Sequence, residues 1–378
     1  MRICIDATPL LLKSAGVKNY LYHWILHLRR VAGEGTVETF PFASGLGPLD
    51  HERSVTGRWA TLAGLARLHW ANCPGLPVLD RMGRRLEVFH ASNLLHRPPR
   101  TCRLTATLYD LTCWLMPAMH TPANVAATRR FAEQVIKRAD GLIAISESTR
   151  QDAVRLLGLE AERVAVIHPG VPEEYFEVPA EAVARVHAKY RLARPYVLFV
   201  GTVEPRKNVP VLVDAYEALP SGLRAQYELV LAGPAGWAER ALVERLRATG
   251  GGVRYLAYVP EPDLPGLTAG AALFVYPSLY EGFGFPVAQA MAAGVPVITS
   301  NGSSLPEITA GAAVLVDPLS MSELRAALER LLDDPAQRAA MATRGAEVAR
   351  RYHWETCARR SLSFFERVAG RRVPSLSE

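Results

Sequence analysis

The sequence predicts an α/β fold with two doubly wound domains, and three observations support this prediction. Short apolar or β-branched segments alternate with segments of helical periodicity along the whole chain. The alternation runs through two complete sets of elements, and a proline-rich segment separates them. The chain has 378 residues, which is enough for two domains of ordinary size. Because alternating strands and helices are typical of parallel sheets with crossover helices, each set should form its own sheet.

The first half of the chain contains predicted strands and the helices that connect them. The strands are Arg2–Asp6, Val88–Ala91, Leu104–Leu108, Gly141–Ile145 and Val164–Ile167. The helices are Lys18–Arg30, Asn124–Arg138 and Ser148–Leu157. A further segment, Arg53–Arg85, carries Trp59, Trp70 and several arginines. We predict that it forms a helical insert packed on the first domain; the alternative is an acceptor-facing or membrane-facing surface.

The second half repeats this alternation with a new set of strands and helices. The strands are Tyr196–Val200, Tyr227–Ala232, Val253–Tyr255, Leu273–Tyr276, Val295–Thr299 and Ala313–Val316. The helices are Val209–Leu219, Ala238–Thr249, Ser322–Leu332 and Pro335–Tyr352. The second set therefore predicts a second parallel sheet.

The domain boundary is predicted within Pro169–Pro195, where prolines end the first set and a helical connector follows. The N-terminal domain would then span residues 1–172 and the C-terminal domain residues 173–353. A last helical segment, residues 354–378, comes after the second set is complete. We expect this segment to pack back on the N-terminal domain.

Composition excludes several classes of protein. The net charge is +6, but Lys and Arg are spread along the chain, so we expect no nucleic-acid partner. The surplus of cations leaves open a peripheral contact with the inner membrane face. The five cysteines are odd in number and not closely paired, which is typical of free thiols in a reducing compartment. The first residues turn acidic early and no run of 18 apolar residues exists, so we expect a cytoplasmic protein without a signal peptide or a membrane span.

The segment Tyr280–Met291 is the most informative motif of the chain. It has an acidic residue, two glycines around an aromatic one, a proline suited to a first helical turn, and an apolar helical run. The N–H groups at such a helix start form an anion site suited to phosphate. We expect Glu281 beside that site and Gln289 in the first helical turn, facing the same way. A phosphate site with two polar neighbours is what a nucleotide-sugar site requires.

Two adjacent cations, Arg206 and Lys207, follow a predicted strand and the turn at Thr202. They should lie at the carboxyl edge of a parallel sheet, where ligands of α/β proteins bind. Two cations can stabilise the charge of a departing diphosphate without a metal. The alternative is a solvated basic turn. The sequence has no typical metal-ligand motif, and we expect neither a metal nor a resident cofactor.

Candidates in the first half are weaker. Gly16 is predicted in a loop between the first strand and a helix, where backbone could approach a phosphate. The residues His90, Ser92 and Asn93 end a strand, and we interpret His90 and Asn93 as acceptor-side candidates. A simple tight turn is the alternative for Gly16.

Taken together, these motifs resemble the retaining, nucleotide-sugar-dependent glycosyltransferases of family 4, and within them the mannosyl- and rhamnosyltransferase-like members. The run from Glu281 to Gln289 looks like the E-x7-E signature of that family. The other matching motifs, in chain order, are Asp6–Leu10, Gly16–Tyr20, Phe89–Asn93, Tyr109–Thr112, Ile145–Arg150, Gly201–Asn208, Tyr258–Pro260 and Ser300–Glu307. The resemblance covers nearly the whole chain. It implies a GT-B fold, in which two Rossmann-like domains face a cleft.

The resemblance also implies roles for residues. Glu281 would contact the donor sugar near the reacting carbon, although a carboxylate that complements a helix dipole is the alternative. Arg206 and Lys207 would bind the diphosphate. The backbone of Gly284 and Phe285, together with Thr202, Val259, Gln289 and Gly16, would complete the donor site.

Two positions depart from the family pattern. Gln289 stands where a second Glu usually bonds the ribose, so the nucleotide contact loses its charge-assisted part. Tyr109 stands where a His usually contacts the donor sugar, beside Asp110, whose alternative role is to cap the next segment. A tyrosine with a reference pKa of about 10 is a poor proton shuttle at neutral pH.

The resemblance implies a retaining, metal-independent transferase that moves a hexose, as from GDP-mannose, to a glycan or lipid-linked acceptor. Tyr109 and Gln289 leave open a sugar-nucleotide-binding protein without strong catalysis. A sugar-nucleotide epimerase of the same fold is the other alternative, because it would need no acceptor.

Overall fold

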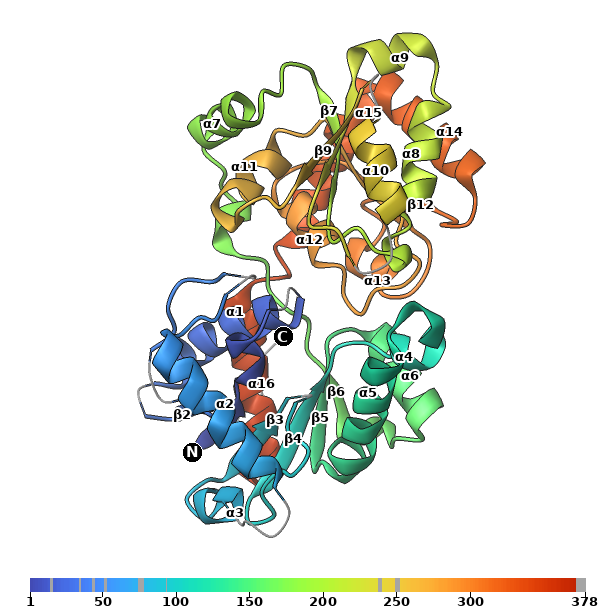
Figure 1. The fold of residues 1–378 in the computed structure, drawn as a ribbon. Helices are drawn as coiled ribbons and strands as arrows, with labels where there is room; N and C mark the ends of the chain where they lie inside the picture. Colours follow the sequence, from blue (N-terminus) through green and yellow to red (C-terminus); the bar gives the residue numbers. More distant parts are fainter. Residues whose placement is uncertain are drawn as a thin grey trace. The chain divides into compact units, whose positions relative to one another are not determined.

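The computed structural model describes residues 1–13, 16–33, 35–42, 45–50, 53–73, 78–92, 94–236, 240–248 and 252–371. These residues form two compact units, each with its own parallel sheet (Figure 1). Unit 1 comprises Met1–Gly170 and the chain from His353 onward, and unit 2 comprises Val171–Tyr352. Unit 1 is left after residue 170, two residues before the predicted boundary after residue 172. Unit 2 ends at residue 352, one residue before the predicted boundary after residue 353.

The described sheet of unit 1 has the strand order β2-β1-β3-β4-β5-β6, with every pair parallel. Its strands are β1 (Ile3–Asp6), β2 (Val37–Phe40), β3 (Val88–Ala91), β4 (Arg103–Leu108), β5 (Gly141–Ala144) and β6 (Val164–Val166). The predicted strands are confirmed, but β2 was missed. It is a short edge strand with Glu38 exposed, so its apolar pattern is weak.

Helices cover both faces of this sheet. The helices α1 (Gly16–Ala32) and α16 (Trp354–Val368) pack together on one face, as the blue and red ribbons of unit 1 show (Figure 1). The side chain of Trp24 on α1 donates a hydrogen bond to Ser361 Oγ on α16 at 2.9 Å. The C-terminal helix thus packs within unit 1. The remaining helices are α2 (Arg58–Asn72), α3 (Val78–Gly83), α4 (Thr112–Leu115), α5 (Pro122–Gln134) and α6 (Glu147–Leu157).

The described sheet of unit 2 has the order β12-β11-β10-β7-β8-β9, again all parallel. Its strands are β7 (Tyr196–Val200), β8 (Glu228–Ala232), β9 (Val253–Ala257), β10 (Leu273–Tyr276), β11 (Val297–Ser300) and β12 (Val314–Val316). From β7, the chain adds β8 and β9 on one side of the sheet. It then returns and adds β10, β11 and β12 on the other side of β7. The direction reverses between β7 and β10, which is where ligands bind in doubly wound sheets.

The helices of unit 2 pack in two layers. Helix α8 packs against α14, and α12 packs against α15. The predicted helix Pro335–Tyr352 ends at Ala349. The helices are α7 (Ala180–Tyr190), α8 (Val209–Glu217), α9 (Ser221–Gln226), α10 (Arg240–Ala248), α11 (Leu264–Ala269), α12 (Phe285–Ala292), α13 (Leu305–Thr309), α14 (Met321–Asp333) and α15 (Pro335–Ala349).

Within the described ranges, none of the helices combines the length and the apolar character that crossing a lipid bilayer demands.

Candidate functional site

Two loops meet where the strand order of unit 2 reverses. The first follows β7 and contains a short 3-10 turn, Pro205–Lys207. The second follows β10 and leads to Glu281. The backbone N–H of Leu279 donates to the carbonyl oxygen of Arg206 at 2.8 Å, which ties the two loops together. Because β7 and β10 are parallel neighbours, their carboxyl ends present both loops at one edge of the sheet.

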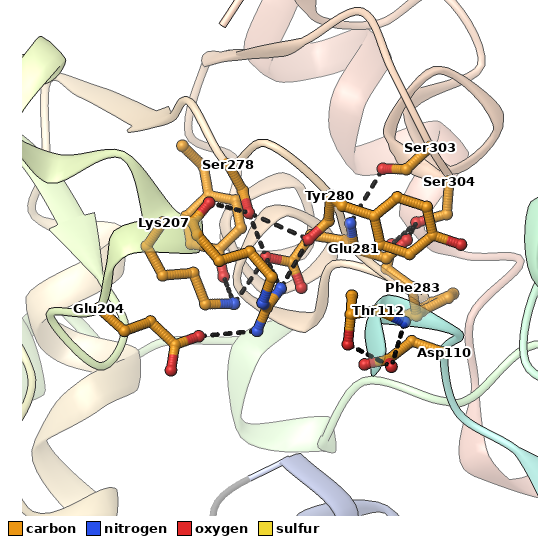
Figure 2. A network of polar contacts seen from close by, with 12 residues as sticks. Asp110, Thr112, Glu204, Lys207, Ser278, Tyr280, Glu281, Phe283, Ser303 and Ser304 are labelled. Carbon is orange, nitrogen blue, oxygen red and sulfur yellow. Dashed lines mark hydrogen bonds and ion pairs between the residues drawn. The ribbon is translucent and has the colours of Figure 1, made fainter. Parts of the chain in front are cut away.

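The carboxylate of Glu281 is the centre of this site. Its Oε1 accepts hydrogen bonds from Lys207 Nζ at 2.6 Å and from Ser278 Oγ at 2.6 Å. Arg206 Nη1 lies 3.0 Å from the same oxygen as an ion pair. Figure 2 shows Lys207 and Ser278 pointing toward Glu281. Glu281 and Lys207 are both buried, so the interaction is shielded from water.

The electrostatics of the site favour the ionised carboxylate. Burial alone raises the pKa of Glu281, but the charges of Arg206 and Lys207 and the hydrogen bonds from Lys207 and Ser278 outweigh it and hold the pKa at about 2. Burial lowers the pKa of Lys207, and the Glu281 carboxylate acts in the opposite direction. Glu281 is therefore a fixed negative charge at neutral pH, which does not donate a proton.

Both cations have further partners. Arg206 Nη2 pairs with Glu204 Oε1 at 2.8 Å, and Arg206 Nη1 donates to the carbonyl oxygen of Tyr280 at 2.6 Å. Lys207 Nζ donates to the hydroxyl of Tyr276 at 2.6 Å. The sequence predicted separate duties for the cations and for Glu281, whereas the structure pairs them directly. Each cation is thus positioned by its neighbours rather than extended into water.

A third loop, after β11, supports the Glu281 segment and was missed by the sequence analysis. Ser303 Oγ accepts a hydrogen bond from the Glu281 backbone N–H at 3.0 Å. Ser304 Oγ donates to the carbonyl oxygens of Glu281 and Phe283 at 3.0 and 2.9 Å. The sequence feature that could have indicated this support is the adjacent pair Ser303 and Ser304. This pair lies in the Ser300–Glu307 motif, which follows β11, the strand next to β10.

The start of α12 has the predicted glycine geometry but fewer free donors than expected. Gly284 is the N-cap residue with a φ of +97°, and a Cβ there would meet Leu305 Cδ2 at 2.7 Å. Both facts favour glycine. Pro286 has no N–H, and the N–H of Val287 donates to the Gly284 carbonyl oxygen at 3.0 Å. Phe285 packs edge to face on Phe283, with centroids 5.2 Å apart.

The other predicted donor-side residues occupy different positions in unit 2. Gln289 lies in the second turn of α12, not the first, because the helix begins at Phe285. Its side chain is buried. Thr202 is half-buried in the loop after β7, and Val259 is buried after β9. A contact from Val259 to a ligand would therefore use its backbone.

In unit 1, the strand order reverses between β1 and β3, and Asp6 links the ends of these two strands. Its Oδ1 accepts from the N–H of Thr8 at 3.0 Å, and its Oδ2 accepts from the N–H of Ser92 at 3.3 Å. Burial raises the pKa of Asp6, and the hydrogen bonds from Ser92 and Thr8 oppose that rise. Through these hydrogen bonds, Asp6 connects the segments that follow β1 and β3.

The interpretation of His90 as an acceptor-side residue is wrong. His90 is buried under Trp24 and Phe365, and its two ring nitrogens are within 3.0 Å of the hydroxyls of Thr105 and Thr107. Burial lowers its pKa to about 3, so the ring is neutral at pH 7. Asn93, the companion candidate, lies outside the described residues.

Gly16 is also placed differently from the prediction. It is the first residue of α1, not a loop residue, and a Cβ there would meet no atom within 4 Å. The sequence predicts a loop there because a glycine between a strand and a helix is a typical turn signal. Whether its N–H serves a ligand stays a prediction.

Tyr109 and Asp110 follow β4 in unit 1. The ring of Tyr109 packs edge to face on Tyr20 with centroids 5.3 Å apart, and burial raises the pKa of its phenol far above the usual value. Asp110 Oδ1 accepts from the N–H and the hydroxyl of Thr112 at 3.0 and 2.7 Å (Figure 2). Asp110 thus performs the capping role that the sequence left open, and one of its oxygens is engaged in it.

In the part of the chain that the structure describes, His, Cys, Asp and Glu side chains do not gather in threes that could hold a metal ion. The expectation that no metal or resident cofactor is needed stays a prediction.

Comparison with known proteins identifies the family of both halves. Residues 184–348 match the family described as glycosyl transferases group 1, and residues 15–175 match glycosyltransferase family 4. The chain is 35% identical over 284 residues to O-antigen chain mannosyltransferase B of Escherichia coli, and the match covers 74% of each chain.

Solved structures show the same architecture. Sucrose-phosphate synthase from Thermosynechococcus elongatus superposes with a TM-score of 0.73 at 20% identity, covering 98% of this chain and 99% of that chain. HepE of Anabaena, solved in complex with UDP and glucose, superposes with a TM-score of 0.71 at 19% identity, covering 97% and 100%. At such identities the likeness concerns the fold, and it confirms the predicted GT-B class. The family matches, the mannosyltransferase relative and the two parallel sheets together show that this chain belongs to the GT-B glycosyltransferases and is similar to mannosyltransferases.

Proposed function

We propose that this glycosyltransferase moves a mannosyl or closely related hexosyl group from a sugar nucleotide, such as GDP-mannose, to a glycan or lipid-linked acceptor in polysaccharide biosynthesis. We propose further that the reaction retains the anomeric configuration and needs no metal. The observation that carries the proposal is the cluster of Arg206, Lys207 and Glu281 where the strand order of unit 2 reverses. The similarity to an O-antigen mannosyltransferase supports the choice of sugar.

The cluster has the charges that breaking a sugar–diphosphate bond requires. As the bond between the anomeric carbon and the diphosphate oxygen breaks, negative charge grows on the diphosphate and positive charge grows on the sugar. Arg206 and Lys207 would stabilise the first, and the ionised Glu281 would stabilise the second. Arg206 offers a planar fork for phosphate oxygens and Lys207 a compact charge. Since the neighbours already hold these side chains, little reorganisation accompanies the reaction.

The proton of the acceptor hydroxyl also needs a destination. The phenol of Tyr109 stays protonated at neutral pH, because burial raises its pKa. Tyr109 would therefore donate a hydrogen bond to the sugar rather than accept a proton. In a retaining reaction the acceptor oxygen takes the place that the leaving diphosphate vacates, so the diphosphate itself can accept the proton. Asp110 remains a second candidate for contact with the sugar.

The nucleotide would be held by α12 and the neighbouring loops. Gln289 carries a buried side-chain amide, whose donor and acceptor groups suit a hydrogen bond to a ribose hydroxyl. Relative to a carboxylate, that bond would be weaker by about 1 kcal/mol. We therefore propose that Gln289 contributes to donor binding without dominating it, with backbone contacts from Gly284, Phe285 and Val259.

We propose that the acceptor binds to unit 1. The reaction would take place in the cytoplasm, at the inner face of the membrane. A lipid-linked glycan is the acceptor class that suits the similarity to an O-antigen enzyme.

A thermal-shift panel of GDP, UDP, TDP and ADP with their sugar forms, without metal and with a chelator, tests the donor site. One nucleotide should raise the melting temperature, and Arg206→Ala should abolish that shift. Arg325→Ala, which removes an exposed arginine paired with Glu329 on α14, should keep it. A folded protein that responds to none of the nucleotides would contradict the proposal.

Product analysis by NMR then tests the chemistry. We expect slow release of the free sugar, or transfer to an added glycan, with the anomeric configuration of the donor kept. An inverted product would overturn the retaining mechanism, and conversion of the donor to its epimer would favour the epimerase alternative.

A further inference from the structure

Helix α2 of unit 1 is apolar on both its inner and its outer side. The inner side is anchored: Gly64 and Ala71 are buried, and a Cβ on Gly64 would meet Leu11 Cδ1 at 2.7 Å, so the helix lies close against the Thr8–Leu11 turn. At its end, Asn72 Oδ1 accepts from the N–H of His96 at 2.9 Å. These contacts hold α2 against unit 1 (Figure 1).

The outer side of α2 exposes large apolar side chains. Trp59, Leu62 and Trp70 are 85%, 58% and 60% exposed. Their spacing, with Ala63 and Ala66 between them, places all five on one face of an α-helix. The two tryptophans are about 16 Å apart along the helix axis. A continuous apolar face of this kind on the surface of a protein marks an interaction site.

Cations border the apolar face on both sides. Arg58 flanks it on one side and Arg67 on the other, and α2 contains no acidic residue. Arg67 Nη1 donates to the carbonyl oxygen of Pro41 at 2.9 Å, so its charge is not neutralised by that contact. This combination of tryptophan, leucine and arginine is typical of helices that lie in a membrane interface.

The sequence from the start of α2 to residue 100 is cationic as well. Residues 58–100 contain seven arginines and two acidic residues. The arginines are Arg58, Arg67, Arg81, Arg84, Arg85, Arg97 and Arg100. Of the two acidic residues, Glu87 pairs with Arg371 and the N-terminal amine, and Asp80 Oδ1 accepts from the backbone N–H of Arg100 at 2.7 Å. The excess positive charge of this segment complements an anionic surface.

We infer that the outer face of α2, defined by Trp59, Leu62, Ala63, Ala66 and Trp70, binds the surface of an anionic lipid bilayer. The helix lies parallel to the membrane, with its tryptophans among the lipid head groups and acyl chains and the flanking arginines on the phosphates. This inference rests on the proposed function in one respect, because a lipid-linked acceptor would be found at such a surface. The charge complementarity favours lipid over a second copy of this chain, whose α2 carries the same positive charge.

Vesicle binding by the full-length protein tests the inference. We expect binding to vesicles of equal parts phosphatidylcholine and phosphatidylglycerol and much weaker binding to phosphatidylcholine alone. Raising the salt from about 0.1 M to about 1 M, which shortens the Debye length from about 10 Å to about 3 Å, should weaken binding. The double variant Trp59→Ala/Trp70→Ala should lose about tenfold or more in affinity. Leu319→Ala removes a residue of unit 2 that is 78% exposed, and it should bind like the wild type.

Three outcomes would overturn the inference: no binding of the folded wild type to anionic vesicles, unchanged binding of the double variant, or a stable dimer in light scattering that the double variant dissociates. The nucleotide thermal shift separates this inference from the proposed function. It should be identical in the wild type and the double variant, because the donor residues lie in unit 2. Loss of the nucleotide response with vesicle binding intact would contradict the proposed function alone.

Discussion

The Oε1 atom of Glu281 accepts hydrogen bonds from Lys207 and Ser278 and forms an ion pair with Arg206, so that two loops meet at this atom. Removing one partner of a buried ion pair leaves an uncompensated charge, which typically costs about 3–5 kcal/mol. The cluster is therefore a structural feature of unit 2 as well as a candidate catalytic one. Substitutions there need a stability measurement beside every activity measurement.

The low pKa of Glu281 predicts a specific dependence of stability on pH. Its folded pKa, about 2, lies below the ordinary value of 4.5, so the unfolded chain takes up the proton first as the pH falls. The ionised carboxylate thus contributes stability that is fully present above about pH 4.5 and is lost as the pH falls toward 2. The shift corresponds to about 3 kcal/mol. We expect chemical denaturation at pH 7, 5 and 4 to show less loss of stability for Glu281→Gln than for the wild type.

Glu347→Gln is the matched control for that experiment. Glu347 is exposed on α15, so its substitution should leave the wild-type pH dependence unchanged. Equal slopes for the wild type and Glu281→Gln would show that the ion pairs around Glu281 do not favour its ionised form.

At the scale of elements, the start of α12 determines where the Glu281 segment goes. Gly284 in the left-handed region turns the chain from the loop after β10 into the helix, and Pro286 suits the first helical turn. The serines after β11 then hold the loop from the other side. A change in this turn should therefore move the residues around the candidate site.

A pair of glycine substitutions separates backbone strain from steric conflict. Gly294→Ala introduces only a positive φ, +69°, with no atom near the added Cβ, and should cost about 1 kcal/mol. Gly284→Ala adds a contact of 2.7 Å with Leu305 to a φ of +97°, and should cost about 2–3 kcal/mol or more. Denaturant titration gives both values. An equal cost for both variants would mean that Leu305 moves aside freely.

At the scale of the whole molecule, the chain leaves unit 1 at Gly170 and returns to it at His353. The two crossings run together: the Val171 N–H donates to the Tyr352 carbonyl oxygen at 2.7 Å, and a Cβ on Gly170 would collide with the backbone of Trp354. After the return, α16 buries Trp354, Phe364 and Phe365 in unit 1. The last described helix is thus part of the first folding unit.

In a truncated chain that ends at Tyr352, unit 1 should no longer fold stably, whereas unit 2 should stay folded. Each large apolar side chain of α16 contributes about 1.5–3 kcal/mol when buried, which together approaches the stability of a domain. We expect loss of protease resistance in unit 1, while the nucleotide thermal shift from unit 2 persists. The full-length variant Trp354→Ala/Phe365→Ala should show the same direction with a smaller effect. Intact protection of unit 1 without α16 would contradict this assignment.

The sequence by itself determined the class of the fold, most of the strands, and the position of Arg206, Lys207 and Glu281 after two of those strands. These features depend on local patterns: the period of apolar residues, and glycine or proline where the chain must turn. The edge strand β2 could not be predicted from the sequence, because it has only four residues and its exposed Glu38 interrupts the apolar pattern.

Only the tertiary structure decided which of these residues meet. Lys207 and Glu281 are 74 positions apart, and their ion pair exists because β10 returns to the side of β7 in the sheet. In unit 1, helix packing buries His90 beneath α1 and α16, although its place at the end of a strand suggested an acceptor-side role. Strand order and helix packing are set by the burial of the whole apolar surface of a unit, and no local segment contains that information.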